Sequence, residues 1–173
     1  MLENFDRMLG CFPFSRLSKR GAVLRIYAIE ESEPPLIERE FGAGTGSSAL
    51  IEAAREFAKS DCCCQVESAW DLWQFEGDWK LAPSKVTLSC FGPEFVNDLN
   101  DHLRIDFGTD AHFLPAPRAQ GGLRMVQANL ESLKTLTRDI EERVVPERLN
   151  LWSESGVNFG EALKQAVASL QVN

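Results

Sequence analysis

Both histidines of the chain lie in one short segment that is rich in carboxylates. The titratable side chains of this segment are Asp98, Asp101, His102, Asp106, Asp110 and His112. If residues 103–107 form a strand, His102 and Asp106 project from the same face, because side chains alternate along a strand. Imidazole and carboxylate groups together bind zinc, manganese or iron, and a carboxylate can orient a histidine as a general base. The segment therefore predicts either a metal or acid–base site for hydrolysis at His102, Asp106 and His112, or a solvated sheet face.

Trp70, Trp73 and Trp79 are three of the four tryptophans of the chain, and they fall on one predicted hairpin. Aromatic side chains anchor protein interfaces and stack on ligands, but they also fill hydrophobic cores. We expect helices to cover one face of the hairpin, while the other face either enlarges the core or contacts a ligand. With the polar strand that follows, the residues expected at a ligand or partner surface are Trp70, Trp73, Trp79, His102, Arg104 and Asp106.

A glycine-rich run, Phe41-Gly42-Ala43-Gly44-Thr45-Gly46, leads into a predicted helix. It resembles the first motif of the S-adenosylmethionine-dependent methyltransferases, in which a strand ends in a G-x-G-x-G turn close to the cofactor. The resemblance covers about ten residues. It implies a methyl-transfer enzyme with a doubly wound parallel sheet, in which Gly42, Gly44 and Gly46 contact the cofactor and Glu67 or Asp71 holds its ribose. The alternative interpretation is a strand-to-helix loop without a cofactor.

Five cysteines make an odd number, and Cys62, Cys63 and Cys64 are consecutive. Disulfide frameworks and structural zinc sites space their cysteines differently. We expect reduced thiols, partly buried as small hydrophobic side chains, and hence a reducing compartment.

Composition bounds the size of the fold and the class of partner. The chain has 173 residues, of which 44% are hydrophobic and 25% charged, as in one ordinary globular domain, so we expect a single domain over 1–173. Its net charge is −8, and residues 26–110 hold seventeen carboxylates against six lysines and arginines, a net charge of −11. A surface of this sign repels nucleic acid and anionic membranes and suits a basic partner protein.

The first twenty residues read as an amphipathic helix followed by a basic connector. Leu2, Phe5, Leu9 and Phe12 recur at helical spacing before Pro13. Glu3 and Asp6 and the lack of an apolar run argue against a signal peptide. With no apolar stretch long enough to span a bilayer, the sequence predicts a cytoplasmic protein.

Alternating hydrophobicity predicts strands over 22–29, 36–41, 65–75, 85–91 and 103–107. Clean alternation is typical of an antiparallel sheet with one packed and one wet face. Helical spacing predicts helices after Ser47, from Leu123 to Val144, and from Asn158 onward. The helix from Leu123 to Val144 has a narrow apolar seam, which packs on the last helix or on its copy in a homodimer.

The order of elements predicts an α+β fold. It consists of a mostly antiparallel sheet of about five strands, with helices packed on one face and two C-terminal helices. The sequence contains no G-x-S-x-G, no phosphate-binding glycine loop with its Gly-Lys-Ser/Thr and no H-E-x-x-H. We therefore expect a non-catalytic module without a cofactor that binds a protein or a small ligand, with the methyltransferase-like and metal-assisted hydrolase interpretations as alternatives.

Overall fold

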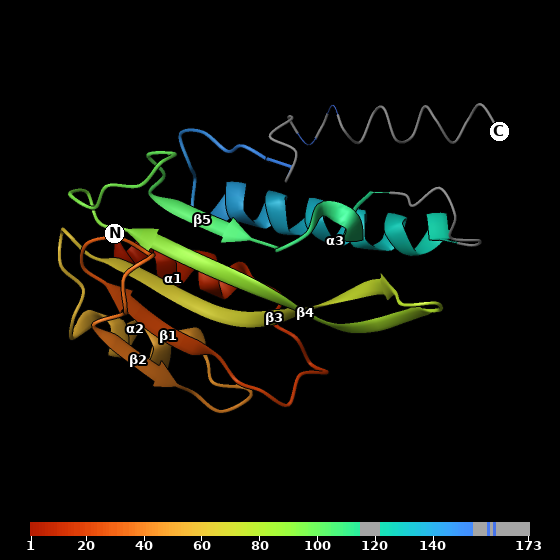
Figure 1. Ribbon diagram of the computed structural model, residues 1–173. Helices are drawn as coiled ribbons and strands as arrows, with labels where there is room; N and C mark the ends of the chain where they lie inside the picture. Colours follow the sequence, from red (N-terminus) through yellow and green to blue (C-terminus); the bar gives the residue numbers. More distant parts are fainter. Residues whose placement is uncertain (115–121, 154–158, 160, 162–173) are drawn as a thin grey trace. The chain divides into compact units, whose positions relative to one another are not determined.

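The computed structural model describes residues 1–114, 122–153, 159 and 161 (Figure 1). The chain divides into two compact units: unit 1 comprises residues 1–70 and 83–107, and unit 2 comprises residues 71–82 and 108–173. Two long strands contribute residues to both units, and the expectation of a single domain stays a prediction. The elements in chain order are α1 (Leu2–Cys11), β1 (Val23–Tyr27), β2 (Ile37–Glu40), α2 (Ser47–Arg55), β3 (Cys63–Phe75), β4 (Trp79–Phe91), β5 (Leu103–Asp106), the 3-10 turn η1 (Asp110–His112) and α3 (Gly122–Arg143).

The five strands form one antiparallel sheet in the order β2-β1-β3-β4-β5. Val23 pairs with Glu40 on one side and with Glu67 on the other, so β1 lies between β2 and β3. The α+β class and the antiparallel sheet predicted from the sequence are confirmed. The parallel sheet that the methyltransferase resemblance implies is not found among the described strands.

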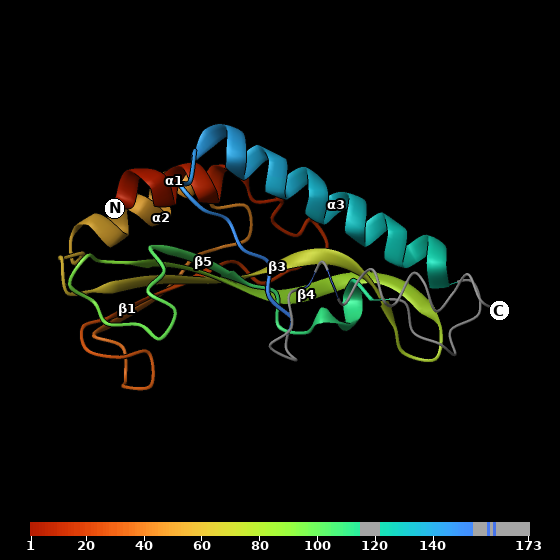
Figure 2. The same ribbon diagram turned by 90° about the horizontal axis from the view of Figure 1, so that it is seen from above.

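In unit 1, α1 and α2 cover one face of the sheet (Figure 2). Leu24 and Ile26 of β1 are fully buried on this side, as are Phe5 of α1 and Leu50 of α2. The N-terminal helix is therefore a core element, because its apolar stripe is buried in the chain itself. Removing such apolar area from water is the main term that stabilises a domain of this size.

Strand β2 forms one edge of the sheet. It has four residues, of which Glu38, Arg39 and Glu40 are exposed and charged. Short, charged edge strands resist pairing with other chains, because a new strand would have to bury their charges.

The other long edge of β3 is paired in three successive pieces. Strand β1 pairs with its first residues, and Phe14 and Ser15 then pair with Trp70 and Ala69, with Ser15 N–H donating to the Ala69 carbonyl at 2.8 Å. Trp73 belongs to unit 2, and its backbone pairs with a side chain of the same unit. Asn129 of α3 accepts from Trp73 N–H at 2.9 Å and donates to the Trp73 carbonyl at 2.9 Å.

Asn129 is buried, and its amide also donates to the His112 carbonyl at 2.8 Å. It does for Trp73 what a neighbouring strand would do, so a helix closes the sheet edge through one side chain. Buried backbone groups that lose their partners destabilise the folded state.

We expect Asn129→Ala to lower the free energy of unfolding by about 2–3 kcal/mol, because Trp73 and His112 lose three hydrogen bonds. Urea denaturation measures this difference. The control is Gln127→Ala, an exposed position on the same helix, which should change the free energy by less than about 0.5 kcal/mol. Equal effects of the two substitutions would contradict the role given to Asn129.

The structure changes several predicted details. β3 begins at Cys63 and β4 at Trp79, so both strands are longer than predicted. The buried stripe of α3 contains Val126, Asn129 and Leu133, whereas Leu123 is 48% exposed. The apolar seam is thus buried in part, at Val126, Leu133 and Val144, and the homodimer stays a prediction. The predicted last helix lies outside the described residues, apart from Phe159 and Glu161, which are helical.

None of the helices in the described residues combines the length and the apolar character needed to cross a membrane.

Candidate functional site

The sheet face of unit 1 opposite α1 and α2 carries charged side chains in two clusters. In the first, Arg25 Nε donates to Glu38 Oε2 at 2.6 Å and Arg25 Nη1 donates to Glu67 Oε2 at 2.8 Å. Lys85 Nζ lies 2.8 Å from the same Glu67 oxygen. Glu67 thus links β1 to β4 across β3, and the cluster holds the wet face together.

Two opposing effects act on the pKa of Glu67. Partial burial alone would raise it, but hydrogen bonds from Lys85 and Arg25 outweigh burial and lower the pKa below its ordinary value of 4.5. The contribution of Glu67 to stability is therefore present above pH 4.5 and is lost as the pH falls through the lower folded-state value.

We expect Glu67→Gln to lower the free energy of unfolding by about 1 kcal/mol near neutral pH and by much less at about pH 3. Urea titrations at both pH values provide the measurement, with Glu56→Gln at an exposed position as the control. A loss of the same size at both pH values would show that ion pairing is not the cause.

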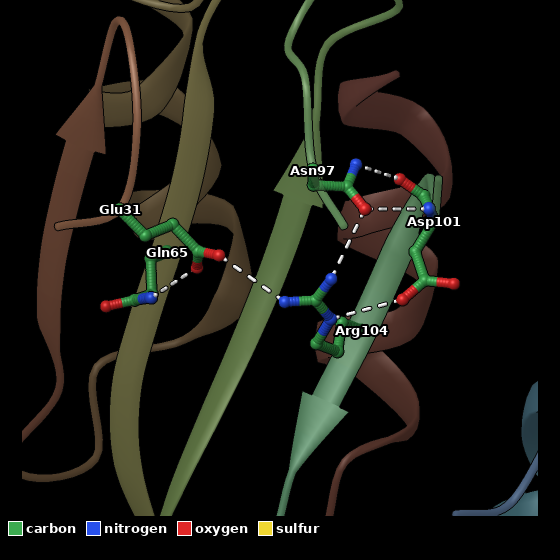
Figure 3. A network of polar contacts seen from close by, with 5 residues as sticks. All are labelled: Glu31, Gln65, Asn97, Asp101 and Arg104. Atoms are coloured by element: carbon green, nitrogen blue, oxygen red, sulfur yellow. Dashed lines mark hydrogen bonds and ion pairs between the residues drawn. The ribbon is translucent and has the colours of Figure 1, made fainter. Parts of the chain in front are cut away.

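The second cluster is centred on Arg104 of β5 (Figure 3). Arg104 Nη1 donates to Glu31 Oε2 at 3.4 Å, Nε donates to Asp101 Oδ2 at 3.1 Å, and Nη2 donates to Asn97 Oδ1 at 3.2 Å. Gln65 of β3 donates to the other oxygen of Glu31 at 3.0 Å. One guanidinium therefore contacts residues from two loops and carries three charge-assisted hydrogen bonds.

Aromatic side chains lie beside the cluster. The guanidinium carbon of Arg104 lies 4.8 Å from the ring centroid of Phe91. Phe91 belongs to a buried group with Tyr27, Cys63 and Phe95. The ring supports the guanidinium from below by a cation–π interaction, which is stronger when the cation is partly desolvated.

Both loops leave the sheet beside the start of β3. The first, residues 28–36, follows Tyr27, which pairs with Cys63. The second, residues 92–102, begins at Gly92, whose N–H donates to the Cys62 carbonyl at 2.8 Å. A Cβ at Gly92 would lie 2.1 Å from the Ser60 carbonyl oxygen, so this close approach requires glycine. We call residues 28–36 and 92–102 the loop pair.

Asn97 closes the second loop. Its Nδ2 donates to the Asp101 carbonyl at 3.0 Å, and its Oδ1 accepts from Asp101 N–H at 2.9 Å. Asn100 between them has φ 53°, a left-handed conformation that asparagine tolerates better than most residues. Side chains of this loop therefore stabilise its conformation independently of Arg104.

The loop pair exposes apolar side chains. Seven large apolar residues of the described chain are more than half exposed, and four of them belong to the loop pair. These four are Ile29 at 72%, Leu36 at 62%, Val96 at 86% and Leu99 at 51%. Isolated exposed apolar residues are common, but their concentration on two connected loops is typical of an interaction surface.

The same loops are strongly acidic. They contain six carboxylates and no lysine or arginine. Arg104 from β5 pairs with Glu31 and Asp101, and Glu30, Glu33, Glu94 and Asp98 are exposed. The loop pair therefore presents apolar side chains among negative charges.

Of the residues predicted for a ligand or partner surface, Arg104 occupies the centre of this site. His102 is exposed at the end of the second loop, and Asp106 is exposed on β5. The sequence also named Asp101, but as a titratable neighbour of the histidines rather than as a partner of Arg104.

The metal alternative gains no support. In residues 1–114 and 122–153, no three or more histidine, cysteine, aspartate or glutamate side chains are arranged so that they could hold a metal ion. His102, Asp106 and His112 form no such group. His112 contributes its backbone carbonyl to Asn129 instead.

The tryptophans divide between core and surface. Trp70 is 3% exposed, and its ring packs on Phe12 and Phe107, with centroids 5.7 and 5.5 Å away. It is a core residue of unit 1. Trp73 and Trp79 are half-buried in unit 2, and Phe75 packs on Trp79 at 5.4 Å.

The glycine-rich run follows the edge strand β2, not a central strand. Gly42 and Thr45 close a turn, in which Thr45 N–H donates to the Gly42 carbonyl at 3.2 Å, and Gly44 has φ 80°. Gly46 caps the start of α2 without a side-chain hydrogen bond. The described geometry is that of a strand-to-helix loop.

Four of the five cysteines are buried, and none of the five forms a disulfide bond. Desolvation raises the pKa of Cys64 and Cys90 to about 12, and it raises the pKa of Cys62 and Cys63 as well. Reaction requires the thiolate, so burial and the raised pKa values both disfavour reaction of these four thiols in the folded chain. Cys63 and Cys64 are the first two residues of β3.

We expect a thiol reagent such as Ellman's reagent to modify only Cys11 rapidly in the folded protein, since it alone is not buried. The other four thiols should react only at the rate at which the chain opens. Stopped-flow absorbance measures both phases, and Cys11→Ser should remove the fast one. A second fast thiol would contradict the burial of the cysteines in β3 and β4.

Sequence reasoning missed Glu31, Gln65 and Asn97. Gln65 shares the wet face of the sheet with Arg25, its neighbour in register, and this alternation was the available signal. Glu31 and Asn97 lie in loops, whose paths follow no periodic rule.

Comparison of the chain with known protein families, with curated proteins and with solved structures finds no match in any of the three.

Proposed function

We propose that this chain is a non-catalytic binding module that recognises a basic segment of a partner protein through the loop pair. The observation that carries the proposal is the concentration of exposed apolar side chains on two acidic loops that one arginine connects. Apolar contacts supply most of the affinity at protein interfaces, while charge complementarity selects the partner.

Charge supports a basic partner. The loop pair contains six carboxylates without a lysine or arginine, within a region of net charge −11 (six basic against seventeen acidic side chains over residues 26–110). A positively charged segment would be attracted over a distance of about 8–10 Å at physiological salt, and a negatively charged one would be repelled.

The defined conformation of the two loops also supports a binding role. Leu36 N–H donates to the Ile26 carbonyl at 2.7 Å, and Phe95 is buried beneath the second loop. Loops that are already ordered lose less conformational entropy on association, so more of the contact energy remains as affinity.

The test uses a labelled peptide in which leucine alternates with arginine. Two comparison peptides carry serine in place of leucine or glutamate in place of arginine. Fluorescence anisotropy should show saturable binding of the first peptide only, weakening as salt is added.

Leu99→Ser should weaken this binding about fivefold, the equivalent of about 1 kcal/mol for a partly buried leucine. Leu17→Ser is the matched control, because Leu17 and Leu99 are both 51% exposed and Leu17 lies outside the loop pair. Equal affinities of the two variants, or equal binding of all three peptides, would refute the proposed site.

A further inference from the structure

The contact between the two loops that Figure 3 shows passes through Arg104. Its guanidinium reaches Glu31 in loop 28–36 and both Asn97 and Asp101 in loop 92–102. These residues are far apart in sequence, and 73 positions separate Arg104 from Glu31. The two loops have no covalent connection shorter than β2, α2, β3 and β4.

The geometry of the cluster depends on a guanidinium. Its three nitrogens each face a different oxygen, at 3.1 to 3.4 Å, and the ring of Phe91 lies 4.8 Å from its central carbon. An ammonium group is a point charge without this planar fork, so lysine cannot hold the three oxygens in the same arrangement.

Each loop also has hydrogen bonds that do not involve Arg104. Gln65 donates to Glu31 at 3.0 Å, and Asn97 closes its own turn onto Asp101. Without Arg104, each loop would keep part of its local order but would lose the polar contacts that Arg104 makes to both loops.

We infer that Arg104 is a positioning residue that couples loop 28–36 to loop 92–102, so that the loop pair binds its partner as one surface. The coupling follows from the contacts alone, and its consequence for binding rests on the proposed function. A partner that touches both loops then finds them in register, whereas uncoupled loops would have to be ordered separately during association.

Amide hydrogen exchange by NMR tests the coupling without any partner. Two reporters are available: the Asp101 N–H, which donates to Asn97 Oδ1 at 2.9 Å, and the Glu33 N–H, which donates to the Glu30 carbonyl at 3.3 Å. Arg104→Ala should accelerate exchange about fivefold or more at both amides. Acceleration at Asp101 alone, or at neither amide, would overturn the coupling.

Arg39→Ala is the matched control. Arg39 also lies over an aromatic ring, with its guanidinium carbon 5.3 Å from the centroid of Phe41, but it sits on β2 outside the cluster. It should leave both reporter amides unchanged. Arg104→Lys should restore the charge but leave exchange closer to the alanine variant than to the wild type.

A double-mutant cycle guards against a general loss of structure in Arg104→Ala. Glu31→Gln, in the first loop, should accelerate exchange at Asp101, in the second loop, and should have no added effect when Arg104 is already alanine. An unchanged Asp101 amide in Glu31→Gln, or additive effects, would show that the loops are independent.

Rescue provides a readout that a purely structural role would not give. Millimolar guanidinium chloride should slow the exchange of both amides in Arg104→Ala, whereas the same concentration of sodium chloride should not. If both salts act alike, the effect is ionic strength and the inference fails.

Binding of the leucine–arginine peptide separates this inference from the proposed function. If Arg104→Ala uncouples the loops and lowers the affinity for the peptide about tenfold, the coupling by Arg104 and the binding role of the loop pair are both supported. Coupling observed with a wild type that binds no peptide would leave Arg104 as a positioning residue and refute the binding role. Unchanged affinity in an uncoupled variant would refute the single surface, even though the wild type binds.

Discussion

The backbone of β3 imposes the central constraint on this fold. The strand is 13 residues long, and its edge opposite β4 needs partners over a length that β1, with five residues, cannot supply. Three different parts of the chain share this edge: β1 at its start, the segment after α1 at Ala69 and Trp70, and the Asn129 amide at Trp73. Buried peptide groups must be hydrogen-bonded, so each stretch of this edge needs its own partner.

The same strand positions the candidate site. Cys63 marks the end of the sheet from which both loops depart, and Gln65, two residues later, holds Glu31. Arg104 reaches the cluster because Ser89 and Arg104 pair in register on β4 and β5. The wet face of the sheet therefore has a division of roles. The Arg25, Glu38, Glu67 and Lys85 cluster ties strands together, while the Arg104 cluster ties loops together at the end of the sheet.

The parts of the fold that could be predicted from the sequence are those with a regular spacing of apolar residues. Alternation over residues 22–29 identified β1 and its buried face, since Leu24 and Ile26 are fully buried while Arg25 is not. The same alternation placed Arg104 on the polar face of β5 and made it a candidate site residue.

The sequence did not indicate its partners Glu31 and Asn97, because residues in different loops come into contact only through the tertiary structure. The structural role of Asn129 was missed for a different reason. The spacing of apolar residues gives no sign of a buried amide side chain whose partners are backbone groups of a strand and a turn. Trp70 was ambiguous in the sequence, because an aromatic side chain fits a core and an interface equally well.

The consecutive cysteines give unfolding a chemical consequence. While the chain is folded, Cys62, Cys63, Cys64 and Cys90 stay protonated and shielded from solvent. Each global opening exposes them together, and adjacent thiols in an extended chain are poorly placed to bridge one another but well placed to bridge other chains. Under oxidising conditions, refolding then competes with intermolecular crosslinking, and the lifetime of the folded chain is set by its opening rate rather than by its equilibrium stability. A reductant removes this crosslinking route, so heating the protein with and without a reductant separates thiol oxidation from unfolding itself.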